Sequence, residues 1–458
     1  MKLKLSTAIA AGKMAYWLSR VRGYQGSSLP GKTALKLYSG TLHDLAKQVR
    51  KGIIVISGTN GKTTTSNMIT EVLLDAGYSV VANREGANMI AGVTTSFLMS
   101  AALGGTIDCD YAVLEVDEAS TPLVLTEVTP CVIVLTNFFR DQLDRYWELD
   151  KIIGVMRDSI KNFKDTTLIL NADDPLVAQF AALTGLRSLF YGLERQKNSN
   201  SSSTQTRESK FCPVCGTPLH YDYFHYGQLG DYRCPSCNFL RPAPQVEALE
   251  LLAVPGGTNC RIRIGQQSVE LTIPTQGLYN VYNALAALSA GLHIGINTKS
   301  ILFSLSRHQS VTGRMELFSH QGKPVYLCLV KNPTGFNQGI ATLCDADGSK
   351  DVFIAINDND ADGRDISWLW DVDFEMLGED HCAYERFICS GQRGEEMALR
   401  LKYAGIPVEK LAVNRDIRSA IKNVLAGGAD SAYLFSTYTA LWPVDKILKQ
   451  LTAKGDTQ

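Results

Sequence analysis

The residues best suited to chemistry in this chain form the stretch Gly-Thr-Asn-Gly-Lys-Thr-Thr at positions 58–64. An apolar run, Gly52–Ser57, precedes this stretch, and a helical pattern over Thr63–Ala76 follows it. Glycines let backbone N–H groups approach phosphate oxygens, and the start of a helix adds a favourable dipole. We expect Lys62 to bridge the terminal phosphates of a nucleotide and Thr63 to bind Mg²⁺ through its hydroxyl. The predicted nucleotide-binding residues of the loop are Gly58, Thr59, Asn60, Gly61, Lys62, Thr63 and Thr64.

Four of the eleven cysteines form two Cys-x-x-Cys pairs that are eighteen residues apart. Such pairs supply four thiolates for a tetrahedral site, and this donor set favours Zn²⁺. Four thiolates leave no open position on the metal, so we expect a structural site. The stretch Tyr221–Tyr232 between the pairs is aromatic and not basic, which favours a scaffold or a partner surface over nucleic-acid binding. The predicted zinc ligands are Cys212, Cys215, Cys234 and Cys237.

The other seven cysteines are scattered along the chain, several of them inside apolar runs. We expect them to be buried free thiols, and buried thiols beside a metal site favour a reducing cytoplasm over a disulfide framework. These cysteines are Cys109, Cys131, Cys260, Cys328, Cys344, Cys382 and Cys389.

Short apolar runs alternate with helical stretches on either side of a polar, serine-rich segment at residues 194–210. This alternation predicts an α/β fold whose parallel sheets are covered on both faces, with the serine-rich segment as a flexible linker. The further strands expected before the linker are Tyr111–Glu115, Cys131–Asn137 and Thr167–Asn171. After residue 320 the expected strands are Val325–Val330, Val352–Asn357, Arg386–Ser390 and Ala432–Ser436, with helices at Glu395–Ala404 and Ile417–Leu425.

Four polar residues fall at or just past the carboxyl ends of apolar runs: Lys62, Glu115, Asn137 and Asn171. Ligands of an open parallel sheet bind at this edge. Polar residues also follow strands simply because loops are exposed to solvent, so no single one of these residues predicts a site. The agreement of all four predicts one.

The bulk composition excludes some classes of protein. With 458 residues and 45% hydrophobic content, the chain can form two or three domains with sizeable cores. A formal net charge of −1 argues against a protein whose main task is to hold nucleic acid. Residues Leu5–Leu18 predict an amphipathic helix packed on the protein, with contact to a membrane surface as the less favoured alternative. Arg22–Lys32 is rich in Gly, Ser and Pro and predicts a loop.

The form GTNGKTT resembles the Mur ligase and folylpolyglutamate synthase superfamily, and five further motifs support the likeness. They are LEVDE around Glu115, Thr136-Asn137 with Asp141–Asp144, the nucleotide segment Asn171–Pro175, the helix Gly277–Asn283, and Ser390–Met397. A sixth motif, Gly313–Glu316, supports it as well. The resemblance implies a central ATPase domain and a Rossmann-like C-terminal domain. It also implies that ATP phosphorylates a carboxylate and that a nitrogen nucleophile displaces the phosphate. Glu115 would then join Thr63 on Mg²⁺, Arg314 would stabilise the transferring phosphoryl group, and Asn171, Asp174 and Asn280 would belong to the nucleotide site.

Two departures from the superfamily pattern narrow this expectation. Only about fifty residues precede the phosphate loop, where ligases of uridine-linked substrates carry a whole domain. The family's metal-binding histidine is Gln142 here, and the position of its carbamylated lysine falls on Met156. Methionine is a poor partner for a hard cation, so we expect one firm Mg²⁺, on Thr63 and Glu115, and an altered or absent second site.

The ligase core, the short N-terminal region and the inserted ribbon together resemble the MurT family, as do residues 330–338 and 355–375. The expected domains are 1–48, then 49–320 with the linker 194–210 and the zinc ribbon 211–241 inserted, then 321–458. The resemblance implies the synthetase subunit of a lipid II isoglutaminyl synthase, working at the cytoplasmic face of the membrane. D-Glutamate in lipid II would be amidated with ammonia from a GatD-type glutaminase in a heterodimer. ATP, Mg²⁺ and structural Zn²⁺ would be its cofactors.

Under this resemblance an aspartate in the acidic run 358–365 would serve the amidation step or complete the partner's catalytic machinery. Asp365 is the favoured catalytic candidate because Ser367, Trp368 and Trp370 beside it could fix its position, and Asp362 is the reserve. A solvated acidic turn is the plainer alternative for the same run.

Two rival functions remain at this point. One is a ligase of the folylpolyglutamate type that adds an amino acid to a carboxylate. The other is a nucleotide-switched zinc-ribbon binding module without turnover.

Overall fold

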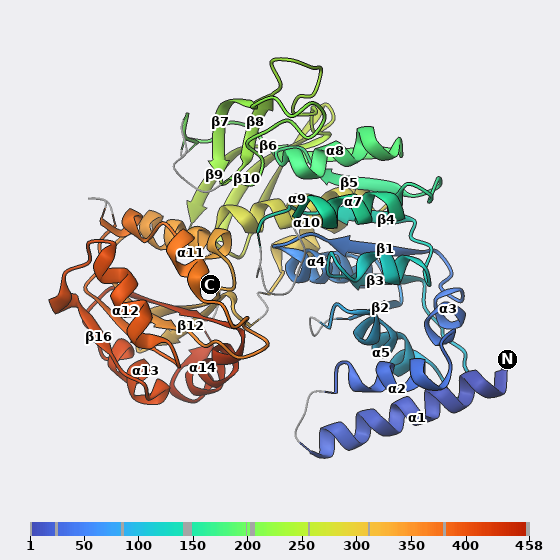
Figure 1. The fold of residues 1–458 in the computed structure, drawn as a ribbon, viewed down its shortest axis with the longest axis horizontal. Coiled ribbons are helices and arrows are strands. Elements are labelled where there is room, and N and C mark those ends of the chain that lie inside the picture. Colours follow the sequence, from blue (N-terminus) through green and yellow to red (C-terminus); the bar gives the residue numbers. More distant parts are fainter. Residues whose placement is uncertain are drawn as a thin grey trace.

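The computed structural model describes residues 2–22, 26–83, 87–140, 149–197, 199–201, 207–254, 257–309, 312–378 and 382–454. These residues form two large sheets, each with helices on both faces, and one small hairpin (Figure 1). The first unit runs from blue to yellow in the figure, and the second unit, in orange and red, lies beside it. An α/β architecture of this kind confirms the fold class predicted from the sequence.

The first sheet has the order β11-β10-β9-β6-β5-β4-β1-β3-β2. All neighbours from β2 to β9 are parallel, as expected. The last two strands are antiparallel, so the expectation of a wholly parallel sheet is wrong there. Only Gly265 and Gln266 join β10 to β11, and so short a connection can link only antiparallel strands. The strands are β1 (Gly52–Ser57), β2 (Val80–Ala82), β3 (Tyr111–Glu115), β4 (Val132–Leu135), β5 (Thr167–Asn171), β6 (Ser188–Leu193), β9 (Val246–Val254), β10 (Gly257–Ile264) and β11 (Gln267–Ile273).

Alternate side chains of the central strand β1 enter two separate cores, as the pleat of a strand requires. Ile54 and Ile56 join the core under α4, α9 and α10. Ile53 and Val55 join the core formed with α1, α3, α5, α6, α7 and α8. These helices are α1 (Lys2–Val21), α3 (Thr41–Ala46), α4 (Lys62–Asp75), α5 (Ile90–Ser100), α6 (Thr121–Leu125), α7 (Leu149–Ile160), α8 (Pro175–Thr184), α9 (Leu278–His293) and α10 (Thr298–Ser306).

The N-terminal helix is confirmed, but the loop expected over Arg22–Lys32 is not a loop throughout. Helix α2 (Leu29–Leu37) begins inside it. Pro30 suits the first turn of a helix, where its missing N–H has no partner to lose. A Cβ on Gly31 would lie 1.9 Å from the carbonyl oxygen of Ala91, so this glycine is a packing residue between helices.

The second sheet has the order β16-β15-β14-β17-β13-β12-β18 and is parallel from β13 to β16. The four predicted strands and both predicted helices are present within a few residues. Strand β12 is not predicted by the sequence pattern, and it already pairs with β13 ahead of the division expected at residue 321. The strands are β12 (Arg314–His320), β13 (Lys323–Leu329), β14 (Lys350–Ala355), β15 (Arg386–Ser390), β16 (Leu411–Val413), β17 (Ser431–Ser436) and β18 (Ala453–Lys454). The helices are α11 (Pro333–Asp345), α12 (Gly394–Tyr403), α13 (Ile417–Leu425) and α14 (Tyr438–Leu451).

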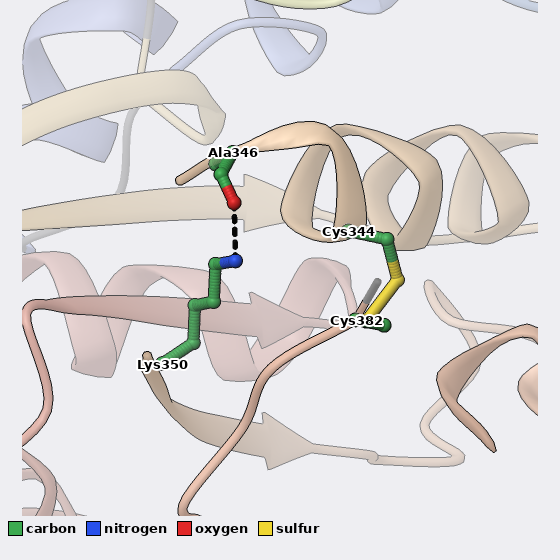
Figure 2. Close-up of a disulfide and its surroundings, with 4 residues drawn as sticks. All are labelled: Cys344, Ala346, Lys350 and Cys382. Atoms are coloured by element: carbon green, nitrogen blue, oxygen red, sulfur yellow. Dashed lines mark hydrogen bonds between the residues drawn. A yellow bond between two sulfur atoms is a disulfide. The ribbon is translucent and has the colours of Figure 1, made fainter. Parts of the chain in front are cut away.

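A disulfide joins Cys344, at the end of α11, to Cys382, which precedes β15 (Figure 2). In the same view Lys350 donates a hydrogen bond to the carbonyl oxygen of Ala346. The prediction of free thiols is therefore wrong for this pair. Thirty-eight residues separate the two cysteines, so only the fold brings them together. The other five scattered cysteines are free, as expected.

Candidate active site

The phosphate loop leaves β1 at Ser57 and enters α4 at Lys62, with positive φ at two of its glycines. Gly58 has φ 123°, and a Cβ there would lie 2.4 Å from the hydroxyl oxygen of Thr136. Gly61 has φ 85°, and a Cβ there would lie 2.2 Å from Oδ1 of Asn283. Any other residue at either position would be strained and would also collide with a neighbour. The loop therefore depends on glycine for its shape.

A Thr-Asn pair just past β4 holds this loop from the side. The N–H of Asn60 donates to Oδ1 of Asn137 at 2.9 Å, and Nδ2 of Asn137 donates back to the Asn60 carbonyl at 3.1 Å. The hydroxyl of Thr136 donates to the same carbonyl at 2.8 Å. The predicted strand Cys131–Asn137 ends early, at Leu135, and its last two residues turn toward the phosphate loop. These three hydrogen bonds tie the middle of the phosphate loop to the residues that follow β4.

Lys62 lies folded against its own loop. Its Nζ donates to the carbonyl oxygens of Gly58 and Thr59 and lies 3.2 Å from Oε2 of Glu118. Both charged side chains are largely buried. Charges interact more strongly where little water surrounds them, so Lys62 can neutralise an anion here more effectively than a surface lysine. Glu118, three residues after Glu115, is a member of this site that the sequence motifs did not predict.

Glu115 is the last residue of β3 and pairs with Ile56 of β1. This register places its carboxylate at the sheet edge where the phosphate loop begins. Glu115 is buried, and its Oε1 accepts from Nδ2 of Asn88 at 3.3 Å. The backbone N–H of Glu115 donates to Oδ1 of Asn83 at 2.9 Å, and Nδ2 of Asn83 donates to the Glu115 carbonyl at 2.7 Å. A carboxylate here and the hydroxyl of Thr63, at the start of α4, are the hard oxygen donors that suit Mg²⁺.

A cavity lies between the phosphate loop and the second sheet. The two units touch beside it, where Nδ2 of Asn332 donates to Oδ1 of Asn60 at 3.1 Å. Arg314 and Lys331 give the second unit's side of the cavity a positive charge that faces the phosphate loop. The cavity can thus place an anionic group between two sets of donors. Its lining includes Asn60, Gly61, Thr64, Asn137, Tyr226, Tyr279, Asn283, Arg314, Lys331, Thr334 and Gln338.

Asn171, Asp174 and Asn280, which the sequence predicts to be nucleotide ligands, are buried and do not line this cavity. Asn171 donates to the Thr136 carbonyl at 3.2 Å, and Asn280 donates to the Gln276 carbonyl at 2.7 Å. Asp174 caps α8 and also accepts from the N–H of Phe138 at 2.9 Å. Burial raises the pKa of Asp174 to about 7, against the lowering effect of these donors. In the structure all three side chains shape the loops around the cavity.

The four predicted zinc ligands come together at the foot of a hairpin. Their sulfur atoms all lie within 4.8 Å of one another, and no other group of three or more His, Cys, Asp or Glu residues in the described ranges could hold a metal. The N–H of Gly216 donates to the Cys212 carbonyl at 2.9 Å, which forms the tight turn of the first knuckle. Four converging thiols fit a tetrahedral zinc ion.

The hairpin between the knuckles, β7 (His220–Tyr226) and β8 (Leu229–Arg233), is bonded directly to the nucleotide segment of the first sheet. The side chain of Gln228 donates to the carbonyl of Phe138 and, at 3.3 Å, to the Asp174 carboxylate. The hydroxyl of Tyr232 donates to the Ala172 carbonyl at 3.0 Å, and Tyr226 reaches the cavity. The ribbon is therefore part of the wall of the site. No local signal in the sequence marks Gln228 or Tyr226 for this role.

The acidic run after β14 does not converge on one point. Asp358 pairs with Arg393 at 2.6 Å, which holds the pKa of Asp358 below its usual value, and Asp360 pairs with Arg364. Asp362 is buried and accepts from the N–H of Thr439 at 2.7 Å.

The favoured catalytic candidate in this run, Asp365, is exposed. Its carboxylate accepts from the N–H and the hydroxyl of Ser367, both at 2.8 Å. Ser367 thus orients Asp365, as the sequence led us to expect, whereas Asp362, the reserve candidate, is held in the interior by Thr439.

The position expected for a second metal ligand is apolar. Met156 is fully buried in the core beneath α7. Gln142 lies outside the described residues. Within the described part of the chain, Thr63 and Glu115 remain the predicted magnesium ligands.

Alanine at position 61 is predicted to destabilise the protein by at least about 2 kcal/mol, because positive φ and the collision with Asn283 act together. Gly77 offers a matched control, because it has the same φ of 85° with nothing within 4 Å of its Cβ position. Gly77→Ala should cost only about 1 kcal/mol. Denaturant unfolding of both variants checks this, and equal losses would show that the contact with Asn283 does not matter.

Comparison with known proteins agrees with this geometry. Residues 56–232 match the Mur ligase middle domain, and residues 329–441 match the MurT ligase C-terminal domain. The chain is 40% identical to the MurT subunit of lipid II isoglutaminyl synthase (glutamine-hydrolyzing) from Staphylococcus aureus strain N315, over 90% of this chain and 91% of that protein. The chain belongs to the MurT family. The corresponding subunit of Streptococcus pneumoniae is 33% identical over 98% of both chains.

Solved structures show the same fold beyond the MurT family. A pseudomurein peptide ligase type C from Methanothermus fervidus has a TM-score of 0.67 at 23% identity, covering 92% of this chain and 84% of that one. MurF from Acinetobacter baumannii has a TM-score of 0.66 at 18% identity, covering 91% and 80%. Mur ligases are ATP-dependent ligases that use Mg²⁺, and this member of the MurT family is an enzyme of that kind.

Proposed function

We propose that the chain is the synthetase subunit of a glutamine-dependent enzyme that amidates the α-carboxylate of D-glutamate in the stem peptide of lipid II. One observation carries this proposal: the chain matches, along nearly its whole length, the MurT subunits of lipid II isoglutaminyl synthase (glutamine-hydrolyzing) from two bacteria. Its partner would be a GatD-type glutaminase that supplies ammonia within a heterodimer. The reaction would take place at the cytoplasmic face of the membrane.

The arrangement of donors around the cavity supports a two-step reaction. A carboxylate oxygen is a poor leaving group, so the carboxylate first accepts the terminal phosphoryl group of ATP as an acyl phosphate. Ammonia then attacks the carbonyl carbon, phosphate leaves with the C–O bond pair, and the nitrogen loses one proton to give the neutral amide. Arg314, which lines the cavity, and Lys62, which belongs to the phosphate loop beside it, would stabilise charge on the transferring group. Mg²⁺ on Thr63 and Glu115 would neutralise the remaining charge.

The test is to purify the chain with a glutaminase partner and incubate lipid II with ATP, Mg²⁺ and glutamine labelled with heavy nitrogen at its amide. Mass spectrometry should show the carboxylate-to-amide shift, with the label in the product. An unchanged lipid II beside an active glutaminase would refute the proposal. A product that gains an amino acid without the glutaminase would support the folylpolyglutamate-type alternative.

Asp365→Asn is predicted to slow amidation by more than about tenfold without changing the melting temperature, because the exposed, oriented carboxylate serves chemistry and not packing. Asp362→Asn should instead lower stability by about 1–3 kcal/mol, since its buried bonds to Thr439 are disturbed. Asp360→Asn is the matched control, because that residue is exposed and pairs only at the surface with Arg364. If Asp365→Asn amidates lipid II at the rate of Asp360→Asn, the acidic run is only a solvated turn.

A further inference from the structure

Helix α1 buries one face against the first unit. Leu5, Ala8, Ile9 and Gly12 recur at helical spacing and are buried. A Cβ on Gly12 would lie 2.4 Å from a methyl carbon of Leu98 in α5, so the two helices are in close contact. Nζ of Lys13 donates to the carbonyl of Ala101 at 2.6 Å and fastens the middle of α1. The helix is thus firmly docked, and its other face is a defined surface.

The outer face of α1 is apolar and open to solvent. The side chains that form it are 43–81% exposed. Four of them follow one another at spacings of three, one and three residues near the C-terminal end, so they lie on one side of the helix. Helix α1 lies at the edge of the molecule, remote from the second unit (Figure 1). The outer face consists of Leu3, Met14, Trp17, Leu18 and Val21.

Positive charge surrounds this apolar stripe. Residues 1–43 contain seven of the 45 Lys and Arg residues and none of the 46 Asp and Glu residues, in a chain whose net charge is −1. Lys4 and Arg20 are exposed on α1, and Arg22 is exposed directly after its last residue. Helix α2, which packs against α1, exposes Lys32 and Lys36 beside Leu37.

We propose that the outer face of α1 is a membrane-contact surface that lies in the headgroup region of an anionic bilayer. A helix with Trp and aliphatic side chains on one stripe and Lys or Arg beside it has the chemistry of an interfacial helix. A second copy of this chain is a poor occupant, because two basic segments would repel each other. No helix among the described residues is long and apolar enough to span a membrane, so the contact is at the surface.

Vesicle binding by the full chain tests this proposal without ATP, lipid II or a partner, so its failure is separate from failure of the proposed reaction. The chain should co-sediment with vesicles of phosphatidylcholine and phosphatidylglycerol in equal parts, and not with phosphatidylcholine alone. Binding should weaken as salt rises. No binding to the anionic vesicles at low salt would overturn the proposal.

Paired variants locate the surface. Trp17→Ser with Val21→Ser, and separately Arg20→Gln with Arg22→Gln, should each weaken vesicle binding by at least about tenfold. Arg20→Lys with Arg22→Lys should retain it, because the charge is kept. Leu252→Ser with Val408→Ser is the matched control, since these apolar side chains are 64% and 59% exposed on other elements.

Equal binding by the parent chain and the α1 variants, each with an unchanged melting temperature, would overturn the assignment. So would variants that leave vesicle binding intact and change only the assembly with a partner protein, because the face would then be a protein interface.

Discussion

Replacing Lys62 by methionine should reduce ATP-dependent turnover by at least about a thousandfold, which is the scale of losing one buried charge that meets the transferring phosphoryl group. Lys62 starts α4, and its ammonium lies among the loop carbonyls at the edge of the sheet. Methionine keeps the length and the apolar stem of lysine and removes only the charge and its donors.

Phosphate release by the chain with its glutaminase partner is the measurement, and Lys164→Met, a change at an exposed lysine, is the control. The methionine also leaves two loop carbonyls without a donor, which should lower stability by about 1–3 kcal/mol. Unfolding curves measure that loss separately, so the rate is compared only where both variants are folded. Turnover within tenfold of the parent protein would show that Lys62 does not act on the phosphoryl group.

The parts of the site that the sequence predicted are those with a local cause. The phosphate loop depends on Gly58 and Gly61, on the apolar strand before them and on the helix after them, and all of these are neighbours in the chain. The zinc site is similar, because each Cys-x-x-Cys pair forms its own turn. Local rules suffice for features of this kind.

Contacts between distant segments were not predictable in this way. The hydrogen bond between Asn332 and Asn60 joins the two units through residues that are 272 positions apart in the chain. Asp174 carries the sequence signature of a nucleotide residue, yet the fold buries it against Phe138 and Gln228. The two cysteines of the disulfide, Cys344 in α11 and Cys382 before β15, are likewise neighbours only in the fold. Each of these depends on how elements pack, which a single sequence does not state.

The zinc ribbon illustrates how a local motif acquires a distant effect. Its sequence indicated a scaffold or a partner surface. In the structure its hairpin donates, through Gln228, to the Phe138 carbonyl and the Asp174 carboxylate, and Tyr226 enters the cavity lining. The segment after β4 that contains Phe138 also holds the phosphate loop, because the hydroxyl of Thr59 donates to the carbonyl of the next residue, Phe139, at 3.1 Å. The consecutive residues Phe138 and Phe139 thus connect the ribbon to the phosphate loop, each through a hydrogen bond to one of them.

Loss of zinc should therefore reduce nucleotide affinity as well as stability. Cys215→Ser removes one predicted ligand from the metal, and a structural zinc contributes folding free energy directly. We expect zinc content to fall from about one ion per chain, the melting temperature to drop by several degrees, and ATP affinity to fall by at least about tenfold. Elemental analysis, thermal unfolding and calorimetric titration with a non-hydrolysable ATP analogue measure the three effects.

Cys131→Ser is the matched control, because it changes a free cysteine of the first sheet that lies outside the ribbon. A second variant, Gln228→Ala, tests whether the ribbon supports the nucleotide site or only lies beside it. Gln228→Ala keeps all four cysteines and removes the donor to Phe138 and Asp174, together with the acceptor for the N–H of Glu208. It should lower ATP affinity while zinc content stays at one ion per chain. If both Cys215→Ser and Gln228→Ala bind the analogue as tightly as the control, the ribbon does not support the nucleotide site, and its hydrogen bonds to the nucleotide segment serve the fold alone.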